Sequence, residues 1–367
     1  MLICLNYKVL HATVYHSKLR PGIRIMSVSR IFICVAAVVL MTAAVMTASA
    51  QPKTKLRPSQ TVLLYADSFE GNIDPVYSDE IVYAGFEMAE KSGLTGPEEI
   101  QASGNITNIS DLARVDIYLP KKGNGQMVVV CPGGGYWKLS SYNEGLYVAE
   151  WLVSKGIAAA VVKYRMPNAH WEVPLADVHN AFRYCRSNAA GWGISKIGVI
   201  GFSAGGHLAA CASNMYVDEV TRPDFSVLVY PVTTFDENVY FSKTRTSLIG
   251  DDSVWDNKEL KASEWLESLK KRDELVEAYS MDKKVTSSTP PTFMAHCTND
   301  KTLVDNSLIY YKALLNAKVP VEMHIYVEGG HGWGFSSEKY KGKGKDKFAF
   351  ARDEFYTSLE RWLKSQL

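Results

Sequence analysis

The stretch KIGVIGFSAGG, residues 196–206, runs from an apolar segment into a single serine that stands among glycines. Its first part predicts a buried β-strand, and the residues after Ser203 predict a helix that begins at once. Gly201 and Gly205 leave the room that a very sharp strand-to-helix turn requires, and Ser203 at its apex would have a strained backbone and an exposed hydroxyl. The pattern G-x-S-x-G also arises by chance as an ordinary glycine turn, so the rest of the chain has to decide between the two interpretations.

Strand and helix signals alternate on both sides of this turn. Apolar runs typical of buried strands cover residues 127–131, 157–162, 197–200, 225–230, 292–295 and 321–327. Helical periodicity covers residues 144–154, 175–190, 205–213, 306–317 and a last segment from about Phe348. Nearly continuous apolar strands separated by helices predict an α/β fold, with a doubly wound, mostly parallel sheet covered on both faces.

The partners that a catalytic serine needs are present in the order that this fold would require. A serine hydroxyl becomes a useful nucleophile when a histidine takes its proton and a carboxylate orients that histidine. Asp300 follows the predicted strand 292–295 and His331 follows the predicted strand 321–327, so both are expected at the same edge of the sheet as Ser203. Asp305 is the alternative acid, but its place directly before helix 306–317 favours a capping role.

Three consecutive glycines, residues 133–135, follow the predicted strand 127–131 in the segment CPGGGYWKLS. Without side chains, their backbone N–H groups can approach a ligand closely. We assign Gly134, Gly135 and, from the turn after the serine, Ala204 as the donors of an oxyanion hole, each worth about 2.7–4 kcal/mol by analogy with known enzymes. A loop that merely needs small residues is the alternative interpretation.

With these features placed, the sequence resembles the secreted bacterial α/β-hydrolases of the acetyl xylan esterase-like (feruloyl/acetyl esterase-like) group. The resemblance runs from about Asp111 onward and rests on YLP, PGGGYWKLS, EGLYVAEWLVSKGIAAAVVKYRMP, VPLADVHNAFRY, WGISKIGVIGFSAGGHLAA, RPDFSVLVYPV and VPVEMHIYVEGGHGWG. It implies an α/β-hydrolase fold with Ser203 as nucleophile, Asp300 as acid and His331 as base, and with residues 133–135 as the oxyanion element.

The resemblance also implies a serine carboxylesterase that removes acetyl groups from hemicellulose such as xylan through an acyl-enzyme intermediate, without a cofactor or a metal. Tyr136 and Trp137, which follow the three glycines, would stack on sugar rings of an acetylated oligosaccharide or polysaccharide. A feruloyl esterase or a peptidase of the same fold, and a non-catalytic glycan-binding protein, are the alternatives.

The chain departs from this group at two places. Leu303 and Val304 stand where the group usually has Val-Pro after the acid. Residues 236–289 form a longer and more charged insertion, which includes Trp255 and Trp265. An insertion of this length is too long for a bare loop, so we expect it to be helical and either to overhang the ligand crevice or to embellish the surface.

The first 50 residues have the pattern of a secretory signal peptide. A basic start at residues 26–30 precedes the apolar run 31–46, and Ala-Ser-Ala at residues 48–50 predicts cleavage after Ala50. Residues 1–25 are interpreted as an over-extended start, residues 51–60 as a flexible leader and residues 61–367 as the catalytic domain. We therefore expect an exported protein, periplasmic or secreted, without a membrane span after cleavage.

The net charge argues against nucleic acid and anionic membranes as partners, and the cysteine pattern argues against disulfides. The first 50 residues hold five of the 40 lysines and arginines and none of the 39 acids, so the rest of the chain has a formal net charge of −4. Such a charge gives no bulk attraction to nucleic acid or to an anionic membrane. Four cysteines remain without C-x-x-C spacing in apolar surroundings, which favours buried thiols over disulfides: Cys131, Cys185, Cys211 and Cys297.

The remaining polar features are predicted to be structural. Asp251 and Asp252 resemble a metal pair but lack His or Glu at ligand spacing. The five lysines at alternate positions in residues 339–347 are expected to form a solvated basic loop, with attraction of acidic glycans as the alternative. Three residues in or beside predicted helices are expected to pack or cap: Asp177, His179 and His207.

Overall fold

The computed structural model describes residues 54–65, 99–101, 104–107, 113–167, 169–237, 239, 242–335, 350 and 354–367. The chain divides into the units 1–49 and 50–367, and all described elements belong to the second unit. The predicted signal peptide and the lysine-rich segment 339–347 lie outside the described residues.

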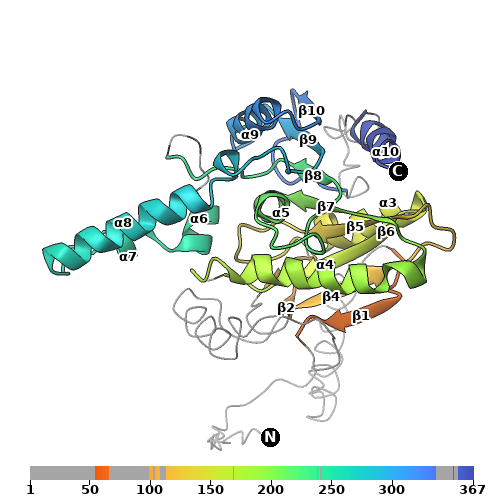
Figure 1. Ribbon diagram of the computed structural model, residues 1–367, viewed down its shortest axis with the longest axis horizontal. Coiled ribbons are helices and arrows are strands. Elements are labelled where there is room, and N and C mark those ends of the chain that lie inside the picture. The colour runs from red at the N-terminus through yellow and green to blue at the C-terminus, as the bar shows by residue number, and fades with distance from the viewer. Residues whose placement is uncertain are drawn as a thin grey trace, which may run out of the picture. The chain divides into compact units, whose positions relative to one another are not determined.

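In this part of the chain, eight strands form one sheet in the order β1-β4-β6-β5-β7-β8-β9-β10 (Figure 1). β1 pairs antiparallel with β4, and β4 pairs antiparallel with β6, whereas all other pairs are parallel. The predicted α/β fold with a mostly parallel sheet is therefore confirmed. In chain order the strands are β1 (Gln60–Leu63), β4 (Arg114–Tyr118), β5 (Gln126–Cys131), β6 (Ala158–Lys163), β7 (Lys196–Phe202), β8 (Ser226–Val229), β9 (Thr292–Cys297) and β10 (Val321–Tyr326).

The central strands are mostly apolar and are buried along nearly their whole length, because helices cover both faces of the sheet. Met127 and Val129 of β5 join the core on one face, while Val128 and Val130 join the core on the other. This alternation is the period of two that a strand imposes on its side chains. A separate two-stranded sheet consists of β2 (Glu99–Ile100) and β3 (Ile106–Thr107).

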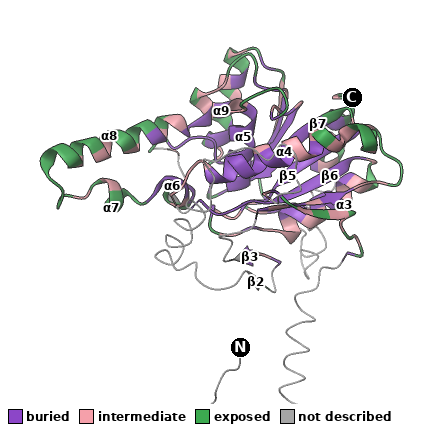
Figure 2. Cartoon of the chain, turned by 60° about the horizontal axis from the view of Figure 1, so that its bottom comes forward, coloured by how far each residue is buried: buried purple, intermediate pink, exposed green. Residues whose placement is uncertain are grey.

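The helices divide between the two faces of the sheet. Buried residues of α4 (Val173–Trp192), α5 (Ala204–Asn214) and α9 (Asp305–Asn316) share one core, which also contains Met127. Buried residues of α3 (Tyr147–Ser154) and α10 (Tyr356–Lys364) share the other core with Val128. Figure 2 shows how completely α4 and α5 are buried where they face the sheet.

The insertion between β8 and β9 contains three α-helices and a short 3-10 turn: α6 (Ser242–Ile249), α7 (Asp252–Trp255), α8 (Ala262–Ala278) and η3 (Met281–Lys283). Leu275 is the one buried residue of α8, and exposed residues line most of that helix (Figure 2). The indole N–H of Trp255 donates to Ile249 O at 3.0 Å, and that of Trp265 donates to Asp256 Oδ1 at 2.8 Å. Both tryptophans thus bond within the insertion itself.

Two local predictions need correction. The helix expected from residue 144 is preceded by the π-helical turn η2 (Tyr142–Leu146), and regular α-helix begins only at Tyr147. Asp305 does not cap α9, because it is the first residue of that helix and the N-cap residue is Val304, without a side-chain hydrogen bond. Sequence position alone places an acid near a helix start but does not fix the exact residue at which the helix begins.

The four cysteines of the described region are buried and unpaired, as predicted. Asp177 accepts hydrogen bonds from the guanidinium of Arg165, with 2.7 Å between Arg165 Nη2 and Asp177 Oδ1, and both side chains are nearly inaccessible.

None of the helices among the described residues has the length and apolar character needed to cross a membrane. Nor do these residues contain a cluster of three or more His, Cys, Asp or Glu side chains that could hold a metal ion.

Candidate active site

The serine turn lies between β7 and α5, and its backbone is strained as predicted. Ser203 has φ 54° and ψ −121°, a conformation that costs a non-glycine residue energy. Gly201 and Gly205 are glycines because of close approach: a Cβ at Gly201 would collide with the carbonyl of Gly205, and one at Gly205 would collide with that of Cys131. Ser203 is only 8% exposed, so its hydroxyl is more enclosed than the sequence led us to expect.

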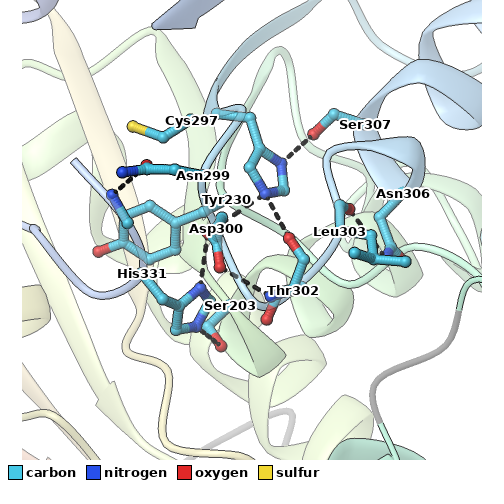
Figure 3. Close-up of polar contacts among 12 residues, drawn as sticks. Ser203, Tyr230, Cys297, Asn299, Asp300, Thr302, Leu303, Asn306, Ser307 and His331 are labelled. Carbon is cyan, nitrogen blue, oxygen red and sulfur yellow. Dashed lines mark hydrogen bonds and ion pairs between the residues drawn. The ribbon is translucent and has the colours of Figure 1, made fainter. Parts of the chain in front are cut away.

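The structure brings Ser203, His331 and Asp300 together (Figure 3). His331 Nε2 lies 2.7 Å from Ser203 Oγ, and His331 Nδ1 lies 2.8 Å from Asp300 Oδ2. A carboxylate can only accept a hydrogen bond, so Nδ1 carries the proton and Nε2 is left to accept the serine hydroxyl. This is the arrangement in which the imidazole can take the proton of Ser203.

Asp300 is surrounded by hydrogen-bond donors. His296 Nε2 lies 3.3 Å from Asp300 Oδ2, and the amide of Thr302 donates to Asp300 Oδ1 at 2.7 Å. Burial alone would raise the pKa of Asp300, but the hydrogen bonds from His296 and His331 outweigh it and hold the pKa below its usual value. Asp300 therefore stays ionised at neutral pH and is able to stabilise a protonated His331.

His296 itself was not singled out from the sequence. It is fully buried, and its Nδ1 lies 2.8 Å from Ser307 Oγ while its Nε2 donates to Thr302 O at 2.8 Å. The signal that points to it is a histidine directly after the apolar run 293–295 of β9, four positions before Asp300. Such a residue needs buried partners, and here these include the acid of the triad.

The glycine loop, residues 133–135, offers two free amides. Gly134 and Gly135 have φ 138° and 68°, values that favour glycine. The Gly133 amide donates to Glu144 Oε2 at 2.8 Å and is thus not available to a ligand. The amides of Gly134, Gly135 and Ala204 have no acceptor among the described residues. These are the three donors assigned from the sequence, whereas the resemblance alone had included Gly133.

A second buried carboxylate, Glu144, bonds to groups of the site and was missed in the sequence. Tyr230 OH donates to Glu144 Oε1 at 2.8 Å, and the amide of Gly334 donates to Tyr230 OH at 2.9 Å. The ring centroids of Tyr230 and His331 are 4.9 Å apart. Burial raises the pKa of Glu144, while the hydrogen bond from Tyr230, the charge of His331 and the Gly133 amide oppose that rise.

The predicted sugar contact of Tyr136 is wrong. Its backbone is left-handed, with φ 62°, and its side chain is 1% exposed. Tyr136 OH donates to His207 Nδ1 at 2.9 Å, and His207 Nε2 donates to Tyr279 O at 2.8 Å. The strained turn therefore directs Tyr136 into the core, and His207 has the structural role predicted for it. Trp137 is 36% exposed, with Lys138 Nζ 4.6 Å from its ring centroid, and stays a candidate platform for a sugar ring.

Comparison with known proteins identifies a family model and two curated relatives that match this chain. A family model described as alpha/beta hydrolase fold matches residues 128–335. The chain is 35% identical over 265 residues to the acetylxylan esterase of Xylanibacter ruminicola, covering 70% of this chain and 50% of that protein. It is 28% identical over 230 residues to endo-1,4-beta-xylanase B of Butyrivibrio fibrisolvens, covering 58% and 33% respectively. The chain thus spans half or less of the length of these curated relatives.

Among solved structures, the acetyl ester-xyloside bifunctional hydrolase from Caldicellulosiruptor lactoaceticus superposes with a TM-score of 0.59 at 26% sequence identity. The match covers 85% of this chain and 98% of that chain. The likeness therefore extends over nearly the whole of that structure and not over the serine turn alone.

Proposed function

This chain belongs to the α/β-hydrolase fold family, and we propose that within it the protein is a serine carboxylesterase that removes acetyl groups from xylan or a related hemicellulose. The observation that carries the proposal is the hydrogen-bonded series Ser203, His331 and Asp300 beside amides that have no acceptor among the described residues. This arrangement supplies a nucleophile, a base and donors for a developing negative charge.

The proposed reaction proceeds in two halves. His331 Nε2 takes the proton of Ser203 as Oγ attacks the acetyl carbonyl carbon, and the amides of Gly134, Gly135 and Ala204 bind the resulting oxyanion. The intermediate collapses, the bond to the sugar oxygen breaks, and His331 returns its proton to that oxygen. Water then attacks the acetyl-Ser203 ester with His331 as base, which releases acetate and restores the serine.

Two kinds of support point to an acetylated glycan as the substrate. One is the likeness to proteins named as an acetylxylan esterase and an acetyl ester-xyloside hydrolase. The other is Trp137, an exposed tryptophan directly after the glycine loop, whose flat face suits a sugar ring. A two-carbon acyl group gains little from apolar burial, so recognition must come mainly from the sugar.

We expect Trp137→Ala to lower kcat/KM for acetylated xylo-oligosaccharide about tenfold to a hundredfold, because one stacked ring contributes about 1–3 kcal/mol by analogy with base stacking. Turnover of 4-nitrophenyl acetate, which lacks a sugar, should change little. Steady-state kinetics on both substrates make the measurement. Trp192→Ala is the matched control, because Trp192 is the last residue of α4, shortly before β7 begins, whereas Trp137 follows the carboxyl end of β5.

Equal losses of Trp137→Ala on both substrates would contradict a sugar platform. A second comparison uses acyl chains of increasing length on one leaving group. Acetyl esters should be turned over faster than butyryl and octanoyl esters, and the reverse order would argue against a glycan acetyl esterase.

Two alternatives cleave another bond or release another group, and a third is not an enzyme. A feruloyl esterase would prefer feruloylated oligosaccharides in a panel with acetylated xylan, mannan and pectin. A peptidase would hydrolyse anilides as well as esters. A non-catalytic glycan-binding protein would not react with a fluorophosphonate, whereas we expect Ser203 to be labelled.

We further propose that the protein is exported to the periplasm or beyond. The support is the basic start, apolar run and Ala-Ser-Ala sequence of residues 26–50. When the full chain is expressed in a bacterium with a C-terminal tag, the tagged protein should be recovered outside the cytoplasm, with Gln51 as its first residue. Retention of the uncleaved chain in the cytoplasm would contradict this.

A further inference from the structure

Glu144 is a buried carboxylate close to the reacting groups, yet no step of the proposed reaction uses it. Glu144 is 3% exposed and lies on the π-helical turn η2. Removing a carboxylate from water is costly, so a buried one depends on the donors around it. A single π-helical turn is also rare and frequently occurs at functional sites.

Both oxygens of Glu144 accept hydrogen bonds from groups that belong to the site. Oε2 accepts from the Gly133 amide, and Oε1 accepts from Tyr230 OH. The Gly334 amide can only donate to Tyr230 OH, so the single hydroxyl hydrogen of Tyr230 goes to Glu144. The carboxylate therefore joins the glycine loop on one side to the loop that carries His331 on the other.

The same carboxylate lies near the charge that forms during the reaction. A Cβ placed at Gly133 would lie 2.8 Å from Glu144 Oε2 and 2.9 Å from Ser203 Cβ, so the carboxylate and the nucleophile are neighbours. Tyr230, which bonds to Glu144, has its ring against that of His331. The titratable groups that act on Glu144 are Tyr230, His331 and Lys138, and it acts in turn on Tyr164 and Tyr230.

We propose that Glu144 is a positioning residue of the esterase reaction: it fixes the oxyanion loop and the His331 loop relative to each other, and its negative charge stabilises the imidazolium formed when His331 takes the proton of Ser203. The inference rests on the proposed function of the site. Asp300 acts on the same imidazolium through Nδ1, so two carboxylates support one protonated histidine.

The test is Glu144→Gln, which keeps the size of the side chain but removes its charge and one acceptor. We expect kcat on 4-nitrophenyl acetate to fall about 10²-fold, because a small displacement of the oxyanion donors has a large effect on the transition state. KM should change little. The acid limb of the kcat/KM profile should move to lower pH by about one unit, because the imidazolium loses a nearby negative charge.

Two further variants separate charge from positioning. Glu144→Asp keeps the charge but shortens the reach, so kcat should fall while the acid limb stays in place. Tyr164→Phe is the matched control, because Tyr164 OH donates to Pro132 O at 2.7 Å and its loss removes a buried hydrogen bond to the same loop without removing a charge. Its acid limb should coincide with that of the wild type.

A Glu144→Gln protein with wild-type kcat, or with an acid limb that does not move, overturns the proposal, as does an equal movement in Tyr164→Phe. If Glu144→Gln does not fold, Glu144→Asp decides, and wild-type kcat in that variant overturns the proposal. A wild-type protein that neither hydrolyses esters nor reacts with a fluorophosphonate would instead refute the proposed function itself.

Discussion

Replacing Ser203 by alanine is expected to lower ester hydrolysis by about 10⁶-fold while leaving the protein folded. The hydroxyl is the nucleophile of the proposed reaction, and its oxygen is the one that His331 Nε2 contacts at 2.7 Å. Alanine keeps the Cβ and the backbone conformation at this turn, so the strain and the stability of the fold should change little. A residual acceleration of about 10³–10⁴ over water can persist, because the oxyanion donors are still present.

The measurement compares turnover of 4-nitrophenyl acetate and labelling by a fluorophosphonate in wild-type and variant protein. Ser213→Ala is the matched control, because Ser213 lies on the same helix, α5, and its hydroxyl donates to Ala209 O at 2.8 Å. The control should retain both activity and labelling. Near wild-type turnover by the Ser203→Ala protein, with contaminating esterases removed, would show that the nucleophile lies elsewhere.

Asp300→Asn is expected to lower kcat by about 10⁴-fold. Two donors, His331 Nδ1 and the Thr302 amide, bond to the Asp300 carboxylate, and His296 Nε2 lies 3.3 Å from its Oδ2. An asparagine can accept through its oxygen only, and its amide nitrogen would face one of these donors. Where that donor is His331, the ring is driven into the tautomer that cannot accept the Ser203 proton.

Asp305→Asn is the companion variant, since Asp305 is the other acid that the sequence offers. Asp305 lies in the first turn of α9 and makes no capping hydrogen bond, so the effect that we expect from its charge is a favourable interaction with the helix dipole. We expect a loss of about 0.3–1 kcal/mol in the free energy of unfolding and unchanged turnover. Loss of activity in Asp305→Asn and retention in Asp300→Asn would transfer the role of the acid to Asp305.

The fold and the three reacting side chains could be predicted because their signals are local or ordered along the chain. The buried strands are continuous apolar runs, as in residues 197–200, and parallel strands bring their carboxyl ends to one edge. A loop residue directly after such a strand must lie at that edge. The order of Ser203, Asp300 and His331 along the chain then predicted their roles, but it left Asp305 as an alternative acid until the structure placed Asp300 against His331.

The supporting residues could not be predicted, because their partners are distant in the sequence. Glu144 bonds to Tyr230, 86 positions away, and Tyr230 bonds to Gly334, 104 positions further on. Nothing in the residues around Glu144 distinguishes it from an exposed acid at the start of a helix. Only the hydrogen bonds that it accepts from Tyr230, directly after β8, and from the Gly133 amide distinguish it.

The burial of Tyr136 could not be predicted for a different reason, which lies in the backbone. A tyrosine after three glycines is indistinguishable, in sequence, from one that lies on a loop surface. The structure gives Tyr136 a positive φ, which is uncommon for a bulky residue, and this one dihedral angle separates a buried side chain from an exposed one. Trp137, the next residue, is 36% exposed.

The buried hydrogen-bonded series Tyr136, His207 and Tyr279 makes the free energy of unfolding depend on pH. Burial lowers the pKa of His207 to about 4, although its hydrogen bond to the Tyr279 carbonyl opposes this. Above pH 6.5 the ring is neutral in both the folded and the unfolded chain, and its contribution to stability is complete. Between about pH 6.5 and pH 4, His207 is protonated in the unfolded chain but stays neutral in the folded chain. The free energy of unfolding therefore falls as the pH falls, by about 3 kcal/mol in total.

Protonation also removes the lone pair of Nδ1 that accepts the hydroxyl of Tyr136. Tyr136 belongs to the loop that supplies two of the oxyanion donors, and Tyr279 directly follows α8 of the insertion. Acid therefore weakens the fold at the point where the donor loop, the serine-bearing helix and the insertion meet. A histidine that takes no part in the proposed chemistry thus makes the stability of the site's surroundings depend on pH in the acid range.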